Sequence, residues 1–250
     1  MPIVDVHAHL PPGANAAPRL LELMDRLEIA RAALIPGGTV SPDALSRNIA
    51  FGGGVDVTPD NARVLEACAR SAGRLCAFYF ANPYQGAAPY LREGRAYAGL
   101  KLGPAVHGVA FDDAHVLELV AAAADFGHPV YLHCLARPGF TVADARALAD
   151  RFASVPIIVG HAAGGHCEFH AIETLASAPN AYIEVSGGFV SFVDACVRRL
   201  GASRVLFGSE YPLQHPAAEL AKIRCLELSS EELRLILGDN ATRLMGQKAS

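Results

Sequence analysis

The stretch Ile3-Val4-Asp5-Val6-His7-Ala8-His9 begins the chain as a short apolar run that ends in two histidines. Seven more short apolar runs follow, many of them β-branched, and each is succeeded by an alanine- and leucine-rich segment with helical spacing. Short apolar runs bounded by such segments predict strands. We expect these strands at 3–6, 31–35, 75–80, 97–102, 129–133, 156–160, 181–185 and 204–207.

The segments between and after these runs predict helices at 18–28, 59–72, 86–95, 113–126, 141–153, 168–178, 189–200 and 215–226. Ser229 and Glu232 then form a capping box that begins one more helix, and Gly238 is expected to end it.

Strand followed by helix, repeated eight times, indicates an α/β fold in which parallel strands pair through right-handed crossovers. Eight such units in 250 residues fit one (β/α)8 TIM barrel over residues 1–250, with extra C-terminal helices. The rival is an open doubly wound sheet, which usually carries a glycine-rich phosphate loop. Gly52-Gly53-Gly54 lacks the required frame, so the barrel is favoured.

The composition excludes several classes of protein. Hydrophobic residues make up 52% of the chain and charged residues 18%, which is enough for a core and unlike a disordered chain. A net charge of −4 is too small to indicate a nucleic-acid or membrane-surface partner. The longest uncharged stretch, 75–91, is interrupted by polar residues and prolines, so no membrane span is predicted. The six cysteines form no C-x-x-C pair and no secretion signal begins the chain, so we expect a cytoplasmic protein with reduced thiols. Its expected partner is a small-molecule substrate, and a homo-oligomer is left open.

The first strand places polar residues where a barrel normally has apolar ones. Alternate residues of a strand face the same way, so Val4 and Val6 are expected to face the helices. Asp5, His7 and His9 would then face the barrel axis. Two inward imidazoles indicate either a metal site or a pair of hydrogen-bonded polar residues at a strand end.

Three other predicted strands also end in groups that bind metals or transfer protons. His133 ends the fifth strand, His161 the sixth and Glu210 the eighth. The carboxyl ends of barrel strands share one rim, where active sites lie, so the recurrence favours a catalytic metal site. His166 and His170, by contrast, lack the glutamate position of H-E-x-x-H and predict an exposed helix start.

In this order, the motifs resemble the amidohydrolase superfamily, and within it the amidohydrolase-related family that includes the aminocarboxymuconate-semialdehyde decarboxylase-like enzymes. The resemblance runs from Ile3 to about Gly246. It rests on Asp5-Val6-His7-Ala8-His9, Gly99-Leu100-Lys101-Leu102, His133, Gly160-His161-Ala162-Ala163-Gly164-Gly165, Phe207-Gly208-Ser209-Glu210-Tyr211-Pro212 and Asp239-Asn240-Ala241.

The resemblance implies a (β/α)8 barrel with a divalent metal at its rim, usually zinc. His7, His9 and His133 would be metal ligands, and His161 would orient or activate water or substrate. Glu210 would ligate the metal and move protons. We expect one metal, zinc with manganese as the alternative, because two would need a carbamylated Lys101 as a bridge, and this family more often leaves that lysine unmodified.

Two positions depart from the family pattern. Glu210 stands where the family normally has Asp, so its carboxylate reaches about an ångström further and its proton-transfer geometry is not assured. Gly103 stands where many relatives have His, which removes any substrate contact from that side chain.

Polar residues near the expected rim are candidates for substrate binding, and the alternative is ordinary loop polarity. They are Arg47, Asn82, Lys101, His107 and Arg137.

The long segment from Pro36 to Thr58 is a candidate lid, because loops of this length in compact domains are usually functional or disordered. Arg47 would then meet an anionic group of the substrate. The alternative is an uninvolved surface loop with a short helix near Pro42–Ala50.

Three functions remain open from the sequence. The leading one is metal-dependent hydrolysis of a small carbonyl compound, such as a lactone, ester or amide. The second is non-oxidative decarboxylation or hydration of a carboxylated ring; the family's decarboxylases are often longer and richer in aromatic residues, whereas this chain is short and has no Trp. The third is an inactive barrel that binds a ligand or a partner, which only Glu210 supports.

Overall fold

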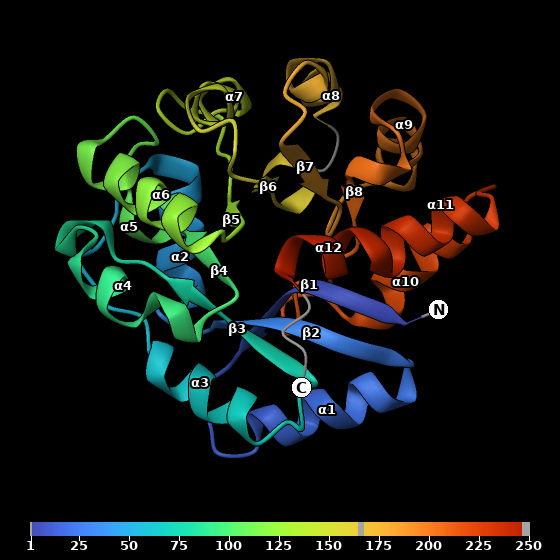
Figure 1. The fold of residues 1–250 in the computed structure, drawn as a ribbon, viewed down its shortest axis with the longest axis horizontal. Helices are drawn as coiled ribbons and strands as arrows, with labels where there is room; N and C mark the ends of the chain where they lie inside the picture. The colour runs from blue at the N-terminus through green and yellow to red at the C-terminus, as the bar shows by residue number, and fades with distance from the viewer. Residues whose placement is uncertain (1, 165–167, 247–250) are drawn as a thin grey trace.

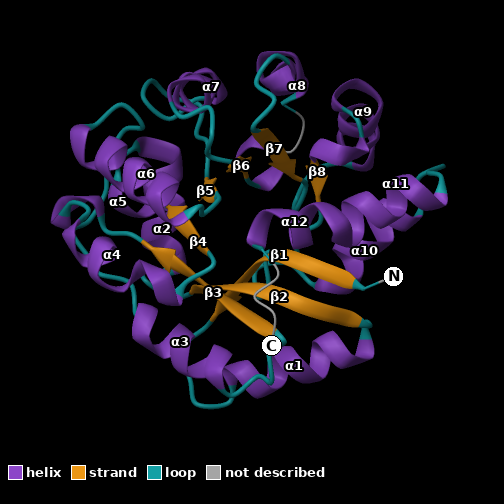
Figure 2. Ribbon diagram, in the orientation of Figure 1, coloured by secondary structure: helices purple, strands orange, loops and turns teal. Residues whose placement is uncertain are grey.

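A computed structural model of the protein describes residues 2–164 and 168–246. Within these ranges, parallel strands pair in sequence order into one eight-stranded sheet, with helices around the outside (Figures 1 and 2). The strands are β1 (Ile3–Leu10), β2 (Ile29–Pro36), β3 (Leu75–Phe80), β4 (Gly99–Leu102), β5 (Val130–Leu132), β6 (Ile157–Val159), β7 (Ala181–Glu184) and β8 (Val205–Leu206). All eight predicted strands are confirmed, with ends shifted by a few residues.

The chain that follows β8 closes the sheet against β1. The backbone N–H of Val6 donates to the carbonyl of Phe207 at 3.1 Å, and the N–H of Glu210 donates to the carbonyl of His7 at 2.8 Å. Further along, the N–H of His9 donates to the carbonyl of Tyr211 at 2.7 Å. The fold is therefore a nearly closed (β/α)8 barrel, and the open-sheet alternative is wrong.

The predicted helices are also present. The helices of the described residues are α1 (Ala16–Arg26), α2 (Pro42–Phe51), α3 (Asn61–Ala69), α4 (Ala88–Glu93), α5 (Pro104–His107), α6 (Ala114–Phe126), α7 (Val142–Arg151), α8 (Phe169–Ala176), α9 (Val190–Leu200), α10 (Pro216–Arg224), α11 (Ser230–Arg234) and α12 (Asn240–Met245). None of them is long and apolar enough to cross a membrane. Gly165, His166 and Cys167 lie outside the described residues, so the expected helix start is tested only from Glu168 onward.

The C-terminal helices confirm one expectation and correct another. Ser229 and Glu232 form the capping box of α11, with both reciprocal hydrogen bonds present. Gly238 does not end the helix, because a π-helical turn over Leu235–Asp239 leads directly into α12. A Cβ on Gly238 would lie 2.3 Å from the carbonyl oxygen of Pro2, so this glycine permits close packing against the start of β1.

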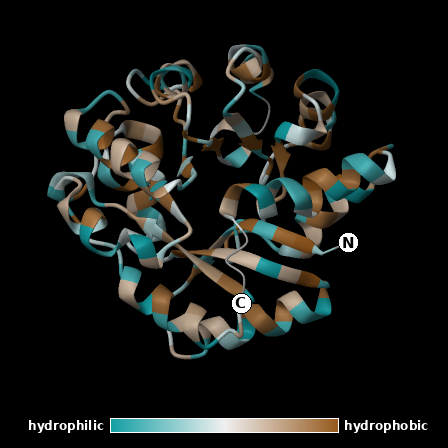
Figure 3. Cartoon of the chain, viewed as in Figure 1, coloured by the Kyte–Doolittle hydropathy of each residue, from teal (hydrophilic) through white to brown (hydrophobic). Residues whose placement is uncertain are grey.

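Two apolar layers result, one inside the barrel and one between the barrel and its helices. Val4 and Val6 pack inside with Phe78, Phe80 and Ile158, and not against the helices as expected. The register of β1 against β2 shifts between Asp5 and Ala8, and this irregularity resets the alternation. Ala8 and Leu10 therefore pack outward in the layer under the helices. Figure 3 shows the surrounding helices with mixed hydrophobic and hydrophilic residues, as expected of helices that cover a core on one side.

Candidate metal centre

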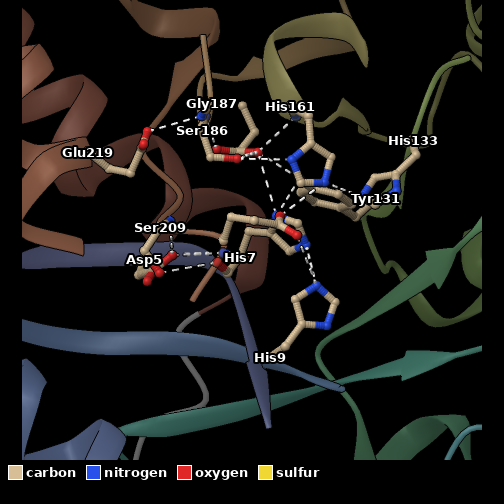
Figure 4. A network of polar contacts seen from close by, with 12 residues as sticks. Asp5, His7, His9, Tyr131, His133, His161, Ser186, Gly187, Ser209 and Glu219 are labelled. Atoms are coloured by element: carbon tan, nitrogen blue, oxygen red, sulfur yellow. Dashed lines mark hydrogen bonds and ion pairs between the residues drawn. The ribbon is translucent and has the colours of Figure 1, made fainter. Parts of the chain in front are cut away.

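Four side chains that could hold a metal converge at the carboxyl end of the barrel. His7 comes from β1, and His133, His161 and Glu210 follow β5, β6 and β8. One nitrogen or oxygen atom from each lies within 4.8 Å of the others. Figure 4 shows the labelled histidines of this group approaching from separate elements. The parallel strands place these side chains together because their ends share one rim.

The backbone is strained at two of these residues. His161 and Glu210 each have φ of 54°, in the left-handed region that residues other than glycine rarely adopt. His161 begins a tight turn over His161–Gly164, in which Ala162 and Ala163 are left-handed as well. Such conformations persist only where surrounding contacts hold them, and they cluster at functional sites.

The contacts inside the group are short. Glu210 Oε2 lies 2.7 Å from His7 Nδ1 and 3.0 Å from His161 Nε2. His133 Nε2 and His161 Nε2 are in direct contact. His9 lies at the edge of the group, with its Nε2 3.0 Å from His7 Nε2 and 3.7 Å from Glu210 Oε1. The longer side chain of Glu210 therefore still reaches the histidines.

The charge states of these groups suit a metal. Burial lowers the pKa of His9 to about 3 and holds the pKa of His133 well below its usual value, so both rings are neutral at pH 7. Burial alone would raise the pKa of Glu210, but the neighbouring His7 and His161 outweigh it and hold that pKa well below its usual value. Burial would lower the pKa of His7, but the nearby Glu210, together with hydrogen bonds to Glu184 and Glu210, raises it, so His7 would release a proton on binding a metal. Neutral imidazoles and a carboxylate are the donors that zinc and manganese accept, so these residues fit a divalent metal.

A second buried carboxylate, that of Glu184 at the end of β7, forms hydrogen bonds with residues at and beside this group. Its Oε2 accepts hydrogen bonds from the hydroxyls of Tyr131 at 2.6 Å and Ser186 at 2.9 Å, and from the N–H of His161 at 3.1 Å. Its Oε1 accepts from the N–H of Ser186 at 2.5 Å. Burial would raise the pKa of Glu184, but hydrogen bonds and charge from His7, with His161 and Tyr131, lower it to about 2.

Glu184 links the elements that carry the candidate ligands. Tyr131, which donates to Glu184, also places its hydroxyl 2.7 Å from His7 Nδ1. Ser186 Oγ lies 3.2 Å from His161 Nδ1. Two glycines leave room for these side chains: a Cβ on Gly160 would lie 2.0 Å from the Tyr131 hydroxyl, and one on Gly208 would lie 2.5 Å from Glu184 Oε1.

The sequence reasoning missed Glu184, Tyr131 and Ser186. The available signal was a glutamate at the end of a predicted apolar strand, the same signal that identified Glu210. Asp5 differs from its expectation in another way. Its carboxylate accepts from the N–H groups of His7 and Ser209, each at 2.9 Å, and so joins β1 to the segment after β8 and does not enter the ligand group.

A cavity of about 480 Å³ opens beside the group, a size that suits a small molecule. Its lining includes the polar side chains of His9, His133, Glu210 and Lys101. Most of the remaining lining is apolar or small: Pro11, Pro12, Pro36, Gly37, Gly38, Thr39, Val40, Ser41, Pro42, Leu45, Phe80, Gly103, Ala105, Val106, Pro212 and Leu213.

The candidate lid forms part of this wall. Residues Pro36 to Pro42 and Leu45 line the cavity, and α2 confirms the short helix expected near Pro42–Ala50. Arg47 lies on α2 with an exposed side chain that does not line the cavity.

The other substrate-binding candidates, apart from Lys101, contact α2 or the segment that follows it. Asn82 donates to Asp56 Oδ1 at 2.7 Å, and His107 Nε2 lies 2.9 Å from the carbonyl of Val57. Arg137 donates to the carbonyl of Asn48 at 2.8 Å. None of these three side chains lines the described cavity wall.

A family model described as amidohydrolase matches residues 4–247. No curated protein matches the chain significantly by sequence.

Solved structures share the fold. A 2,6-dihydroxybenzoate decarboxylase from Rhizobium aligns with a TM-score of 0.71 at 17% identity, over 98% of both chains. A putative 2-pyrone-4,6-dicarboxylic acid hydrolase from Pseudomonas putida aligns with a TM-score of 0.70 at 19% identity, over 100% of this chain and 99% of that one. A 5-carboxyvanillate decarboxylase from Novosphingobium aromaticivorans, determined with bound manganese, gives 0.69 at 18% identity, over 91% of this chain and 80% of that one.

Proposed function

The chain belongs to the amidohydrolase family, and we propose that it is a metal-dependent hydrolase of a small carbonyl compound, such as a lactone, ester or amide. The observation that carries this proposal is the convergence of His7, His133, His161 and Glu210 beside a cavity of about 480 Å³. The largely apolar lining of that cavity, with a few polar side chains, suits a small organic substrate.

We assign one divalent metal, zinc or manganese, to His7, His9, His133 and Glu210. The Nε2 atoms of His7 and His9 face each other at 3.0 Å, as two ligands of one ion would. His161 is the proton-handling residue in this assignment, because its two ring nitrogens already lie beside Glu210 and Ser186. In the competing assignment, His161 is a metal ligand in place of His9, since it lies closer to His7, His133 and Glu210.

The metal would lower the pKa of a coordinated water to about 7 and polarise the substrate carbonyl. Glu210, ionised and 3.0 Å from His161 Nε2, would accept a proton from the attacking water. His161 would take that proton from Glu210 through the same contact and pass it to the leaving group, with its ring oriented by Ser186. Glu184 would hold the backbone of His161 in its left-handed conformation throughout.

Non-oxidative decarboxylation of a ring carboxylate is the second candidate. One buried cation, Lys101, lies in the wall of a largely apolar cavity, a combination that suits a carboxylated ring. Two of the three similar structures described above are decarboxylases, so the comparisons support this chemistry at least as well as hydrolysis. The inactive-barrel alternative is less favoured, because Glu210 reaches the histidines.

The test has two parts. Elemental analysis of the purified protein should find close to one equivalent of zinc or manganese, and His7→Ala with His9→Ala should remove it. Full metal in that double variant would contradict the site. Separate His9→Ala and His161→Ala variants decide which residue completes the ligand set, because only the ligand's loss should release metal.

The second part is a panel of lactones, esters, amides and ring carboxylates. Product analysis separates the candidates, since hydrolysis yields an acid and decarboxylation yields carbon dioxide. Metal-loaded protein that converts no member of the panel would favour the binding-protein alternative.

A further inference from the structure

Lys101 is the one lysine or arginine among the described residues that line the cavity. It comes from β4 and its side chain lies inside the barrel, with the residue 1% exposed. Its Nζ has no hydrogen-bond partner in the described part of the chain. A buried amine with unsatisfied donors is unfavourable, so its presence beside a cavity calls for an explanation.

The surroundings of Lys101 stabilise its charge only in part. Its Nζ lies 3.9 Å from the centre of the Tyr131 ring, and the Tyr131 hydroxyl is already engaged by Glu184. Glu210 and Glu184 also attract it, yet burial outweighs them and lowers the pKa of Lys101 to about 7. The amine therefore has hydrogen-bond donors to spare and a cavity in which an acceptor fits.

We propose that Lys101 binds a carboxylate of the substrate, and that the substrate is a small monocarboxylate with an apolar body. This inference rests on the proposed function and specifies its substrate class. The carboxylate would occupy the cavity beside Nζ, and the apolar body would pack against Phe80, Val106 and Leu45.

Charge counting supports one carboxylate over two. Glu210 is the only acidic side chain in the described lining, and it belongs to the metal group. In the metal-free protein, a second substrate carboxylate would lie in this largely apolar cavity without a further cationic side chain, which is costly. The metal-free protein should therefore discriminate against dicarboxylates.

Calorimetric titration with benzoate and its neutral isostere benzamide tests the proposal. Lys101→Met removes the charge and keeps the length of the side chain. It should weaken benzoate binding by about 10- to 100-fold, the usual contribution of a charge-assisted hydrogen bond, and change benzamide binding by less than about 3-fold. Isophthalate, which carries two carboxylates on the same ring, should bind metal-free wild-type protein more weakly than benzoate.

Three controls make the result interpretable. Arg19→Met removes an exposed cation of α1 that does not line the cavity, and it should leave benzoate binding unchanged. Lys101→Gln provides a second neutral variant should Lys101→Met fail to fold. Wild-type protein stripped of metal with a chelator should still bind benzoate.

The outcomes separate this proposal from the proposed function. Equal affinity of wild-type and Lys101→Met for benzoate would overturn the role of Lys101, even in a fully metal-loaded enzyme. Loss of benzoate binding on chelation, with no effect of Lys101→Met, would assign the carboxylate to the metal and also overturn it. A protein without metal that still loses benzoate affinity in Lys101→Met would sustain the proposal and contradict the hydrolase.

Discussion

Replacing Glu184 by Gln should destabilise the metal-free protein by about 3 kcal/mol at pH 7. Glu184 has a pKa of about 2 in the folded protein against an ordinary value of 4.5, and each unit corresponds to about 1.4 kcal/mol. The hydrogen bonds that the substitution disturbs give a loss of stability of similar size. Four donors meet the carboxylate, and a Gln amide would turn its own N–H groups toward at least one of them. Each buried donor left without an acceptor costs about 1–3 kcal/mol.

The assay is urea unfolding of chelator-treated wild-type and Glu184→Gln proteins. The carboxylate has a depressed pKa, so its stabilisation is complete above about pH 4.5 and is lost as the pH falls toward 2. The difference in the free energy of unfolding between the two proteins should therefore narrow as the pH falls from about 4.5 to 2. In the metal-loaded enzyme the variant should also lose activity, because the N–H of His161 loses its acceptor.

Glu219→Gln is the matched control. Glu219 is also buried, and it accepts from the N–H of Gly187 at 3.2 Å (Figure 4). It also pairs with Lys222 at 2.5 Å. Burial raises its pKa, the opposite direction from Glu184, so neutralising it should cost less than about 1 kcal/mol. Equal losses in the two variants would refute the claim that Glu184 is an ionised anchor of the site.

Other perturbations address the cavity and its neighbours. Glu210→Gln should lower kcat by at least about 10²-fold on any identified substrate, and Glu210→Asp should retain metal; a wild-type rate with full metal in Glu210→Gln would make the carboxylate a bystander. Shortening the segment Pro36–Thr58 should raise KM or lower kcat without changing metal content, and unchanged kinetics would refute the lid. Lys101 has a pKa lowered from 10.5 to about 7, so burying its charged form destabilises the folded protein most below about pH 7, and this cost disappears as the pH rises to about 10.5. Metal-free Lys101→Met should thus exceed wild type in urea stability by a few kcal/mol at pH 6, with the gap closing toward pH 10, and a constant gap would contradict the shift.

The amino-acid sequence by itself determined which segments are strands and where the candidate ligands lie along the chain. Apolar runs and the helices between them reflect local preferences and period, which a sequence displays directly. His7, His133, His161 and Glu210 could be identified because each follows such a run, and the parallel barrel then brings every strand end to one rim.

Only the tertiary structure decided how side chains meet across the barrel. The register shift in β1 turned Val4 and Val6 inward, since it depends on pairing with β2 and not on the alternation within one strand. Asn82 and His107 hydrogen-bond to the loop over 56–57 and so do not line the cavity, because loop geometry determines their neighbours.

Glu184 is the clearest example of a residue whose role the sequence alone could not predict. Its sequence position resembles that of Glu210, yet it forms the hydrogen-bonded support of the site and Glu210 lies among the candidate ligands. The difference arises from Tyr131 and the turn at His161, which reach Glu184 from β5 and from the end of β6. A buried carboxylate takes its role from the donors that surround it, and those donors are brought together only when the barrel closes.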